Sequence, residues 1–256
     1  MKTIAIVNRK GGVGKTITAI ELAYILATMG RRVLVIDADS QCNATITLLP
    51  SALQGTGLAG ALRQPPEEYR DLVQSTDIPF LDLIPATEDL GDFELECTLG
   101  LAKPDFSLLR TLVAALMEDD AYDNVVIDCP PYYSVSCISA VSACDSIVIP
   151  VGVDAYSTVG MAALVRQIDN IRRACPHVRV AGCMVTQWHR APVSENAVDT
   201  LRDTSPVPIF RTHIRRTDKA PESSWAGMPV GQWSPFSAAA RDYRAWVAEL
   251  AERGVI

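Results

Sequence analysis

A run of glycine, lysine and threonine residues near the start of the chain has the composition of a phosphate-binding loop. Residues 10–16 read KGGVGKT, after an apolar run at 4–7 and before a helix-like pattern. Glycines let the backbone turn tightly and point N–H groups at an anion, and a helix N-terminus adds partial positive charge. Lys15 would then reach the β- and γ-phosphates of a nucleotide, and the Thr16 hydroxyl would bind Mg²⁺. A glycine-rich turn with a solvated lysine is the alternative, but the order of strand, glycines, Lys-Thr and helix favours the phosphate loop.

The loop departs from the standard pattern where it begins. That pattern requires a glycine five residues before the last loop glycine, and this chain has Arg9 there. A second lysine, Lys10, opens the glycine run instead. Its side chain cannot easily fold back onto phosphates that its own loop encloses. We therefore expect Lys10 to reach a nucleotide held by a second copy of the protein.

Aspartates that end two apolar segments could supply the carboxylates that such a site needs. Asp37 and Asp39 follow VLVI at 33–36, and Asp128 follows VVI at 125–127. Ligands of open α/β sheets bind outside the carboxyl ends of the strands, so these side chains are expected beside the phosphate loop. There one carboxylate could orient Mg²⁺ or its waters, and another could position an attacking water. For a single aspartate, a role in a helix cap or turn is the alternative.

The segments that must position these residues alternate between strand and helix patterns. Apolar, β-branched runs predict buried strands, and apolar residues at i, i+3 and i+4 predict helices. The predicted strands cover 4–7, 33–36, 80–85, 125–128, 146–151, 178–186 and 207–213. The predicted helices cover 15–29, 104–117, 135–143, 158–174, 194–203 and 235–253, with short helices over 51–75 that break at Pro65-Pro66. We interpret the acidic run at 86–103 as an irregular, solvated surface segment.

These patterns predict an α/β fold in which a mostly parallel, twisted sheet carries helices on both faces. No linker or composition shift marks a second domain, so residues 1–256 are expected to form a single domain. The net charge of −7 argues against a protein wholly devoted to nucleic acid, yet it leaves room for a local basic patch. Scattered cysteines without a C-x-x-C pair, and the lack of a signal peptide or a membrane-length apolar run, predict a cytoplasmic protein with reduced thiols.

Basic residues gather late in the chain. Arg211, Arg215, Arg216 and Lys219 fall within one short segment. They could form a surface that contacts the phosphate backbone of DNA. They could equally be solubilising side chains on helices and loops, and the sequence does not separate the two interpretations.

The segment 235–253 predicts an amphipathic helix. Tyr243, Trp246, Val247 and Leu250 share one face of it. Its other face mixes acidic and basic residues, whereas a helix that lies on a membrane carries a mostly basic polar face. We therefore expect this helix to dock on the protein's own core.

Together, the motifs resemble those of the ParA/MinD family of deviant Walker-A P-loop ATPases, and within it the small ParA (Soj-like) partition branch. KGGVGKT at 10–16 is similar to the deviant loop, with Lys10 at the signature lysine. VLVIDADSQCNAT at 33–45 resembles the strand that ends D-x-D-P-Q-x-N, and VVIDCPP at 125–131 resembles the Walker-B segment. HIRRTDKAPESSWAGMPV at 213–230 looks like a diverged form of the late I-P-R-x-x-x-x-x-E segment. The resemblance runs the full chain.

The resemblance implies an ATP hydrolase that requires Mg²⁺. The implied nucleotide contacts are Lys10, Gly11, Gly12, Val13, Gly14, Lys15, Thr16, Ile17 and Arg215. Lys10 and Lys15 are implied to act in catalysis with Asp39, which positions or activates the water. Thr16, Asp39 and Asp128 are implied to serve Mg²⁺.

The resemblance also implies partners. ATP binding forms a homodimer whose interface Lys10 crosses, and this dimer binds DNA nonspecifically through Arg216 and Lys219. A ParB-like partner then stimulates hydrolysis and release, which drives plasmid or chromosome segregation. The implied location is the cytoplasm, on the nucleoid when ATP is bound, with no membrane partner and no N-terminal helix-turn-helix extension.

Three positions depart from the family pattern. Ser40 replaces the proline and Cys42 the glycine of the second motif, so the loop after the aspartates is expected to have a different shape. Arg215 stands where the proline of I-P-R is expected, close to the implied adenine site. The contacts to adenine are therefore left open.

Other functions occur on the same fold. A membrane-cycling, MinD-like positioning ATPase needs a basic amphipathic tail, which the ending 252–256 does not offer. An iron–sulfur electron carrier needs one cysteine per subunit at a dimer axis, and neither Cys97 nor Cys129 has the expected glycine-flanked setting. A ligase-like enzyme needs a pocket for a second substrate, which the sequence does not reveal.

Overall fold

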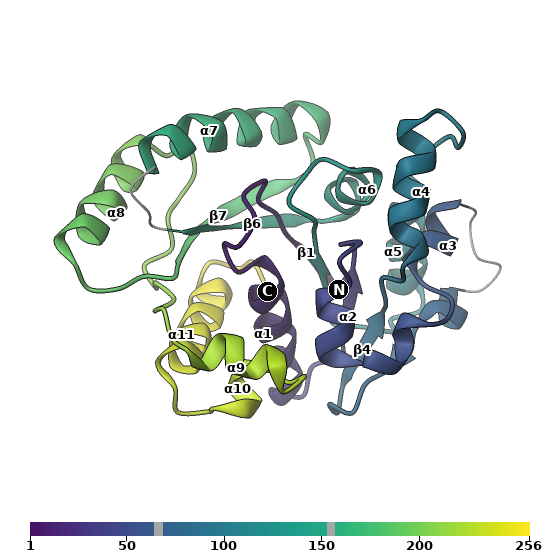
Figure 1. Ribbon diagram of the computed structural model, residues 1–256, viewed down its shortest axis with the longest axis horizontal. Helices are drawn as coiled ribbons and strands as arrows, with labels where there is room; N and C mark the ends of the chain where they lie inside the picture. The colour runs from purple at the N-terminus through teal and green to yellow at the C-terminus, as the bar shows by residue number, and fades with distance from the viewer. Residues whose placement is uncertain (64–68, 153–156) are drawn as a thin grey trace.

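One twisted sheet organises the chain, of which the computed structural model describes residues 1–63, 69–152 and 157–256 (Figure 1). The predicted break at Pro65-Pro66 lies outside the described residues. The strands are β1 (Lys2–Ile6), β2 (Val33–Asp37), β3 (Gln74–Ser75), β4 (Leu81–Ile84), β5 (Asn124–Asp128), β6 (Ser146–Gly152) and β7 (Arg179–Thr186). They form a 7-stranded sheet of order β3-β4-β2-β5-β1-β6-β7, parallel except for the β3–β4 pair. The predicted fold class is confirmed.

Helices cover both faces of this sheet (Figure 1). They are α1 (Lys15–Thr28), α2 (Asn43–Leu48), α3 (Leu58–Arg63), α4 (Asp89–Thr98), α5 (Leu108–Glu118), α6 (Val135–Ala143), α7 (Ser157–Ala174), α8 (Pro192–Thr204), α9 (Lys219–Trp225), α10 (Val230–Trp233) and α11 (Ala238–Glu252). Alternate strand residues feed two separate cores, because successive side chains of a strand point to opposite faces. Ile4 and Ile6 pack with α1 and α11, whereas Ala5 and Val7 pack with α5 to α8.

The register of the central strands brings three loops to one edge of the sheet. β5 lies between β2 and β1, and Asp128 is the register partner of both Asp37 and Ile6. The loops that follow β1, β2 and β5 therefore begin side by side at the carboxyl edge. This is the edge at which open α/β sheets bind ligands.

The prediction that the acidic segment at 86–103 is irregular and solvated is wrong, because the segment contains the helix α4. Leu90 and Phe93 are buried, and so is Glu94, at 9% exposure. Three side chains on one helix face thus anchor the segment, while its other carboxylates face solvent.

The strand expected at 207–213 is also wrong, because within the described structure this segment makes a single isolated bridge, from Ile209 to Cys183 of β7. Pro206 and Pro208 have no N–H to donate to a ladder. The backbone N–H groups of Arg211 and Thr212 donate instead to the carboxylate of Glu249 on α11. The Glu249 side chain thus satisfies two backbone donors that a regular strand pair would otherwise satisfy.

The C-terminal helix docks as expected. Trp246 and Leu250 are fully buried, and Tyr243 donates or accepts a hydrogen bond of 3.1 Å with Thr18 of α1. Trp246 also packs edge-on against Phe210, with ring centroids 5.9 Å apart. The apolar face of α11 is therefore part of the core that supports α1 and its loop.

Candidate functional site

The glycine loop between β1 and α1 has the backbone that phosphate binding requires. Gly12 and Gly14 have φ of +71° and +82°, a conformation that side chains disfavour, and α1 begins directly after Gly14. The Asn8 side chain accepts from the Lys10 N–H (2.9 Å) and donates to the Pro150 carbonyl (2.6 Å), so it ties the loop to β6.

Two polar residues at the end of β7 hold the loop from the other side. The Thr186 hydroxyl donates to the Val13 carbonyl at 2.8 Å, and the Gln187 amide donates to the Gly12 carbonyl. Sequence analysis missed both residues and Asn8. The signal was the same one that singled out the aspartates, namely polar side chains directly after an apolar strand.

Lys15 is buried, with its ammonium held inside the loop. Its Nζ donates to the Lys10 carbonyl at 3.3 Å, and the residue is 7% exposed. Burial lowers the pKa of Lys15, while the nearby carboxylates of Asp128 and Asp39 oppose that decrease. The Lys15 ammonium therefore interacts with both of these carboxylates. Lys10 itself is exposed, and Val13 is buried.

Asp128 has a carboxylate that the described residues leave unsatisfied. It is fully buried, and neither oxygen has a hydrogen-bond partner among these residues. Burial raises its pKa well above the usual value, and the negative charge of Asp37 adds to the rise. The Thr16 hydroxyl is near enough to oppose the rise, although it completes no hydrogen bond of standard geometry. An orphaned buried carboxylate beside a threonine hydroxyl fits a bound cation.

Asp37, its neighbour in register, is satisfied. One oxygen accepts from the Thr45 N–H (2.8 Å) and hydroxyl (2.7 Å), and the other accepts from the Asp39 N–H (3.2 Å). The Thr45 hydroxyl in turn accepts from the Ala86 N–H at 3.0 Å. Asp37 therefore shapes the loop that follows β2. Burial raises its pKa to about 6, although the Thr45 contacts oppose this.

Asp39 is intermediate between these two. One of its oxygens accepts from the Gln41 N–H at 3.0 Å, and the residue is 5% exposed. Burial raises its pKa, against the lowering effect of the Gln41 N–H and Lys15. Asp39 shares a cavity of about 440 Å³ with the loop residues Gly11, Gly12, Gly14, Lys15, Thr16 and Ile17. The cavity thus joins most of the predicted nucleotide contacts to the predicted water-positioning residue.

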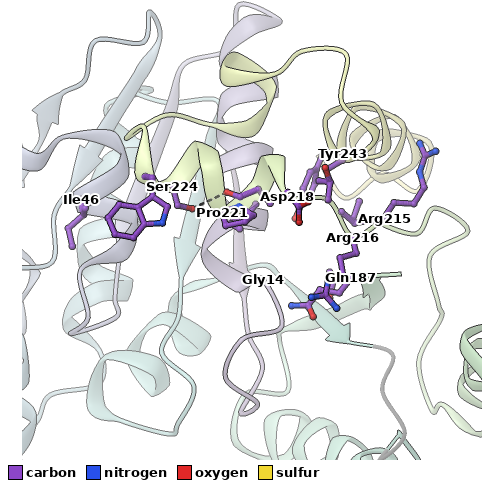
Figure 2. Close-up of a pocket in the computed structure, with 16 residues that line it drawn as sticks. Gly14, Ile46, Gln187, Arg215, Arg216, Asp218, Pro221, Ser224 and Tyr243 are labelled. Carbon is purple, nitrogen blue, oxygen red and sulfur yellow. Dashed lines mark hydrogen bonds between the residues drawn. The ribbon is translucent and has the colours of Figure 1, made fainter. Parts of the chain in front are cut away.

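A second cavity, of about 740 Å³, adjoins the first at Gly14, Ile17 and Gln187 (Figure 2). Apolar residues that line it include Ile214 and Pro221. Its size and its position next to the phosphate loop fit a nucleoside.

Arg215 lines this cavity with its backbone end only. Figure 2 shows its guanidinium directed away from Gly14, and it pairs with both oxygens of Asp242 on α11. The shorter of these contacts is 2.6 Å, between Nη2 and Oδ1. Its charge is therefore balanced within the protein. Arg216 is exposed at the rim, beside Gln187 (Figure 2).

Most charges of the late basic segment have acidic neighbours. Arg211 pairs with Glu252, and Lys219 pairs with Glu222 at 2.6 Å. Such exposed pairs are weak and can exchange for phosphate contacts. Arg216 is exposed, lines the larger cavity and makes no ion pair with another described residue.

Two further findings concern metals and membranes. Within the described ranges no three His, Cys, Asp or Glu side chains gather into a cage that could hold a metal ion alone. Mg²⁺ is commonly held by one or two carboxylates together with substrate phosphates, so this finding fits a nucleotide-borne ion. None of the described helices is long and apolar enough to cross a membrane.

The sheet order and the glycine loop between β1 and α1 define a P-loop nucleotide-binding fold. A family model described as an AAA domain matches residues 1–179. The chromosome-partitioning ATPase Soj of Thermus thermophilus is 34% identical over 257 residues, which cover 99% of this chain and 96% of that protein. The chromosome partitioning protein ParA of Caulobacter vibrioides is 31% identical over 255 residues, which cover 99% and 95%.

A solved structure has the same fold. Cobyrinic acid a,c-diamide synthase from Mycobacterium smegmatis, with bound ATP analogue and magnesium, superposes with a TM-score of 0.81 at 25% identity, covering 99% of this chain and 96% of that one. The chain belongs to the ParA/Soj family of chromosome-partitioning ATPases.

Proposed function

We propose that the protein is a positioning ATPase that binds Mg²⁺-ATP, dimerises around it, binds DNA nonspecifically and hydrolyses ATP under the control of a ParB-like partner. The observation that carries the proposal is the buried, unsatisfied carboxylate of Asp128, beside Thr16 and Lys15 at the end of the glycine loop. A structural aspartate would not be left without donors.

Each residue of the loop has a task in this proposal. The N–H groups of the glycine loop cradle the phosphates, and the buried Lys15 ammonium neutralises charge on the β- and γ-phosphates. Thr16 and Asp128 hold Mg²⁺, which would neutralise charge that develops during phosphoryl transfer. Asp39 positions the attacking water, and its raised pKa suits a group that shares a proton with that water.

The nucleoside is proposed to lie in the larger cavity, against Ile17, Ile214 and Pro221. Because Arg215 is committed to Asp242, we assign it a supporting role in the shape of this cavity, without direct base contact. Gly14 and Gln187 line both cavities, so a nucleotide that spans them would touch the loop and β7 together.

Dimerisation and DNA binding extend the proposal beyond one chain. Exposed Lys10 would reach the phosphates of the partner's ATP, so that two copies must meet before hydrolysis. Arg216 and Lys219 would contact DNA phosphates, Lys219 by exchange from Glu222.

Sedimentation with ATP or ADP, with and without nonspecific duplex DNA, tests the proposal. We expect a dimer only with ATP and Mg²⁺, and co-sedimentation with DNA only for that dimer. The double variant Arg216→Ala/Lys219→Ala should keep the dimer and lower the salt slope of DNA binding, while Arg110→Ala serves as a matched control on exposed α5. DNA binding that is equal with ATP and ADP would contradict the proposal.

A further inference from the structure

The cavity assigned to the nucleoside contains an unused carboxylate. Asp218 is exposed and lines this cavity of about 740 Å³, and Figure 2 shows it between Pro221 and Arg216. Aspartate is a preferred N-cap, and Asp218 occupies that position of α9, yet its side chain makes no capping hydrogen bond. It also makes no ion pair with another described residue. Its oxygens are therefore available to a ligand in the cavity.

A second acceptor of the cavity is the side-chain amide oxygen of Gln187. The Nε2 group of Gln187 donates to the Gly12 carbonyl, and the reverse amide orientation would bring two oxygens together. The oxygen Oε1 is therefore the end that remains available. The backbone of Gln187 has φ of +53°, which side chains disfavour. Such strain persists where the surrounding structure holds a residue in place at a functional site.

Several donors of the cavity lining are used within the protein. They are the guanidinium of Arg215 and the hydroxyls of Thr186 and Ser224. The Thr217 hydroxyl accepts from the Lys219 N–H at 3.2 Å, so its own proton is left for a ligand. Arg216 adds an exposed guanidinium at the rim. A base in this cavity thus meets a carboxylate, an amide oxygen and, beside the carboxylate in the chain, two donors.

Guanine and adenine differ along the edge that these groups would contact. Guanine has N–H donors at N1 and N2 beside the O6 acceptor, whereas adenine has a donor at N6 beside the N1 acceptor. A carboxylate only accepts, so Asp218 can bond both N1–H and N2–H of guanine. On adenine it can bond N6–H alone, and its other oxygen meets the lone pair of N1. Thr217 and Arg216 can donate to O6 but find no acceptor at N6. The free groups of the lining therefore suit guanine better than adenine.

We propose that the cavity binds guanine as well as adenine, that Asp218 sets the preference between the two bases, and that GTP is a second substrate of the protein. This inference rests on the proposed nucleotide site. The glycine loop contacts the triphosphate, which GTP and ATP share, so hydrolysis follows the same course for both. The water oxygen bonds to the γ-phosphorus, and the bond to the β,γ-bridging oxygen breaks with its electron pair going to GDP. One water proton leaves to solvent by way of Asp39.

The base contact is tested by calorimetric titration of GDP, IDP and ADP, each with Mg²⁺, because the diphosphates are not hydrolysed. The base of IDP is guanine without the N2 amino group, so it isolates one of the two contacts to Asp218. The wild type should bind GDP no more than about threefold more weakly than ADP, and at least about fivefold more tightly than IDP. GDP binding that is weaker than this limit, or equal to IDP binding, would overturn the proposal. This comparison needs no variant.

Variants of Asp218 separate base selection from a structural role. Asp218→Asn should weaken GDP binding by at least about tenfold and leave ADP binding equal or tighter, since a carboxamide can accept from N6–H and donate to N1. Asp218→Ala should abolish the difference between GDP and IDP. Asp203→Asn, on exposed α8, should change none of these affinities. Equal weakening of GDP and ADP by Asp218→Asn would overturn the assignment.

Phosphate release tests GTP as a substrate. The wild type should hydrolyse GTP with a kcat within about threefold of that for ATP, because the reacting atoms are the same. Asp218→Asn should raise KM for GTP at least about tenfold and leave kcat unchanged, since Asp218 contacts the base alone. ATP hydrolysis without GTP hydrolysis would overturn this inference and leave the proposed function intact. If the wild type binds none of these nucleotides, the proposed function fails as well.

Discussion

Asp37 and Asp128 end neighbouring strands in register and are both fully buried, yet the protein treats them in opposite ways. Asp37 accepts three hydrogen bonds from Thr45 and the Asp39 backbone, whereas Asp128 accepts none from the described residues. A buried carboxylate without donors costs stability, and natural proteins keep such costs mainly where function requires them. Asp37 therefore shapes the loop beside the site, whereas the carboxylate of Asp128 is left available to a ligand.

The largest effect should follow from the unsatisfied carboxylate. Asp128→Asn keeps the size of the side chain but removes the charge that Mg²⁺ needs. We expect ATP hydrolysis, measured by phosphate release, to fall by at least about a thousandfold. Asp120→Asn, on an exposed turn, should leave the rate unchanged. Hydrolysis by Asp128→Asn at the wild-type rate would remove Asp128 from the metal site.

Asp39 lies between these two cases, because one of its oxygens accepts a hydrogen bond and the other accepts none from the described residues. Asp39→Ala should keep nucleotide binding and trap the ATP-bound dimer, since neither needs a positioned water. Single-turnover hydrolysis should fall by about a hundredfold. Normal turnover would take the water-positioning role away from Asp39.

Alanine substitution of Asp37 and of Asp128 should change the free energy of unfolding in opposite directions. In the absence of nucleotide and Mg²⁺, Asp37→Ala should lower the free energy of unfolding by about 3 kcal/mol, because it strands the buried N–H and hydroxyl of Thr45. Asp128→Ala should raise it by about 1 kcal/mol, because it removes a buried carboxylate that accepts no hydrogen bond from the described residues. Urea denaturation measures both. The same sign for both variants would break the comparison.

A third buried carboxylate makes the stability of the fold depend on pH. Glu21 on α1 accepts from the Gly231 N–H at 3.1 Å, and burial raises its pKa from 4.5 to about 7. Its folded pKa lies above its unfolded pKa, so stability falls as pH rises from 4.5 to about 7 and is constant above. Glu21→Gln should therefore exceed the wild type by up to about 3 kcal/mol at alkaline pH and match it below pH 4.5. A pH-independent difference in urea denaturation would exclude this linkage.

The parts of the site that sequence predicted were those carried by local patterns. The glycine loop, the aspartates at strand ends and the amphipathic α11 can each be recognised from a short stretch of sequence. The same patterns predicted the fold class. They predicted neither the order nor the register of the strands, because both depend on contacts between distant segments.

The parts that sequence missed depend on long-range partners. No sequence pattern indicates that Thr45 will donate hydrogen bonds to Asp37. None indicates that Arg215 will pair with Asp242. The α4 helix was missed because charged residues outnumber its buried ones, although Leu90 and Phe93 have helical spacing. Segment 207–213 was predicted to be a strand. The prediction failed because two of its backbone donors bind the side chain of Glu249, a contact that no sequence pattern reveals.

The most direct test is a calorimetric titration of the slowly hydrolysed analogue ATPγS, with and without Mg²⁺, into the wild type, Asp128→Asn and Asp37→Asn. We expect Mg²⁺ to raise the affinity of the wild type for this analogue by at least about tenfold. We expect the same gain for folded Asp37→Asn and no gain for Asp128→Asn. An equal gain for Asp128→Asn and the wild type would contradict the claim that the unsatisfied carboxylate holds the metal.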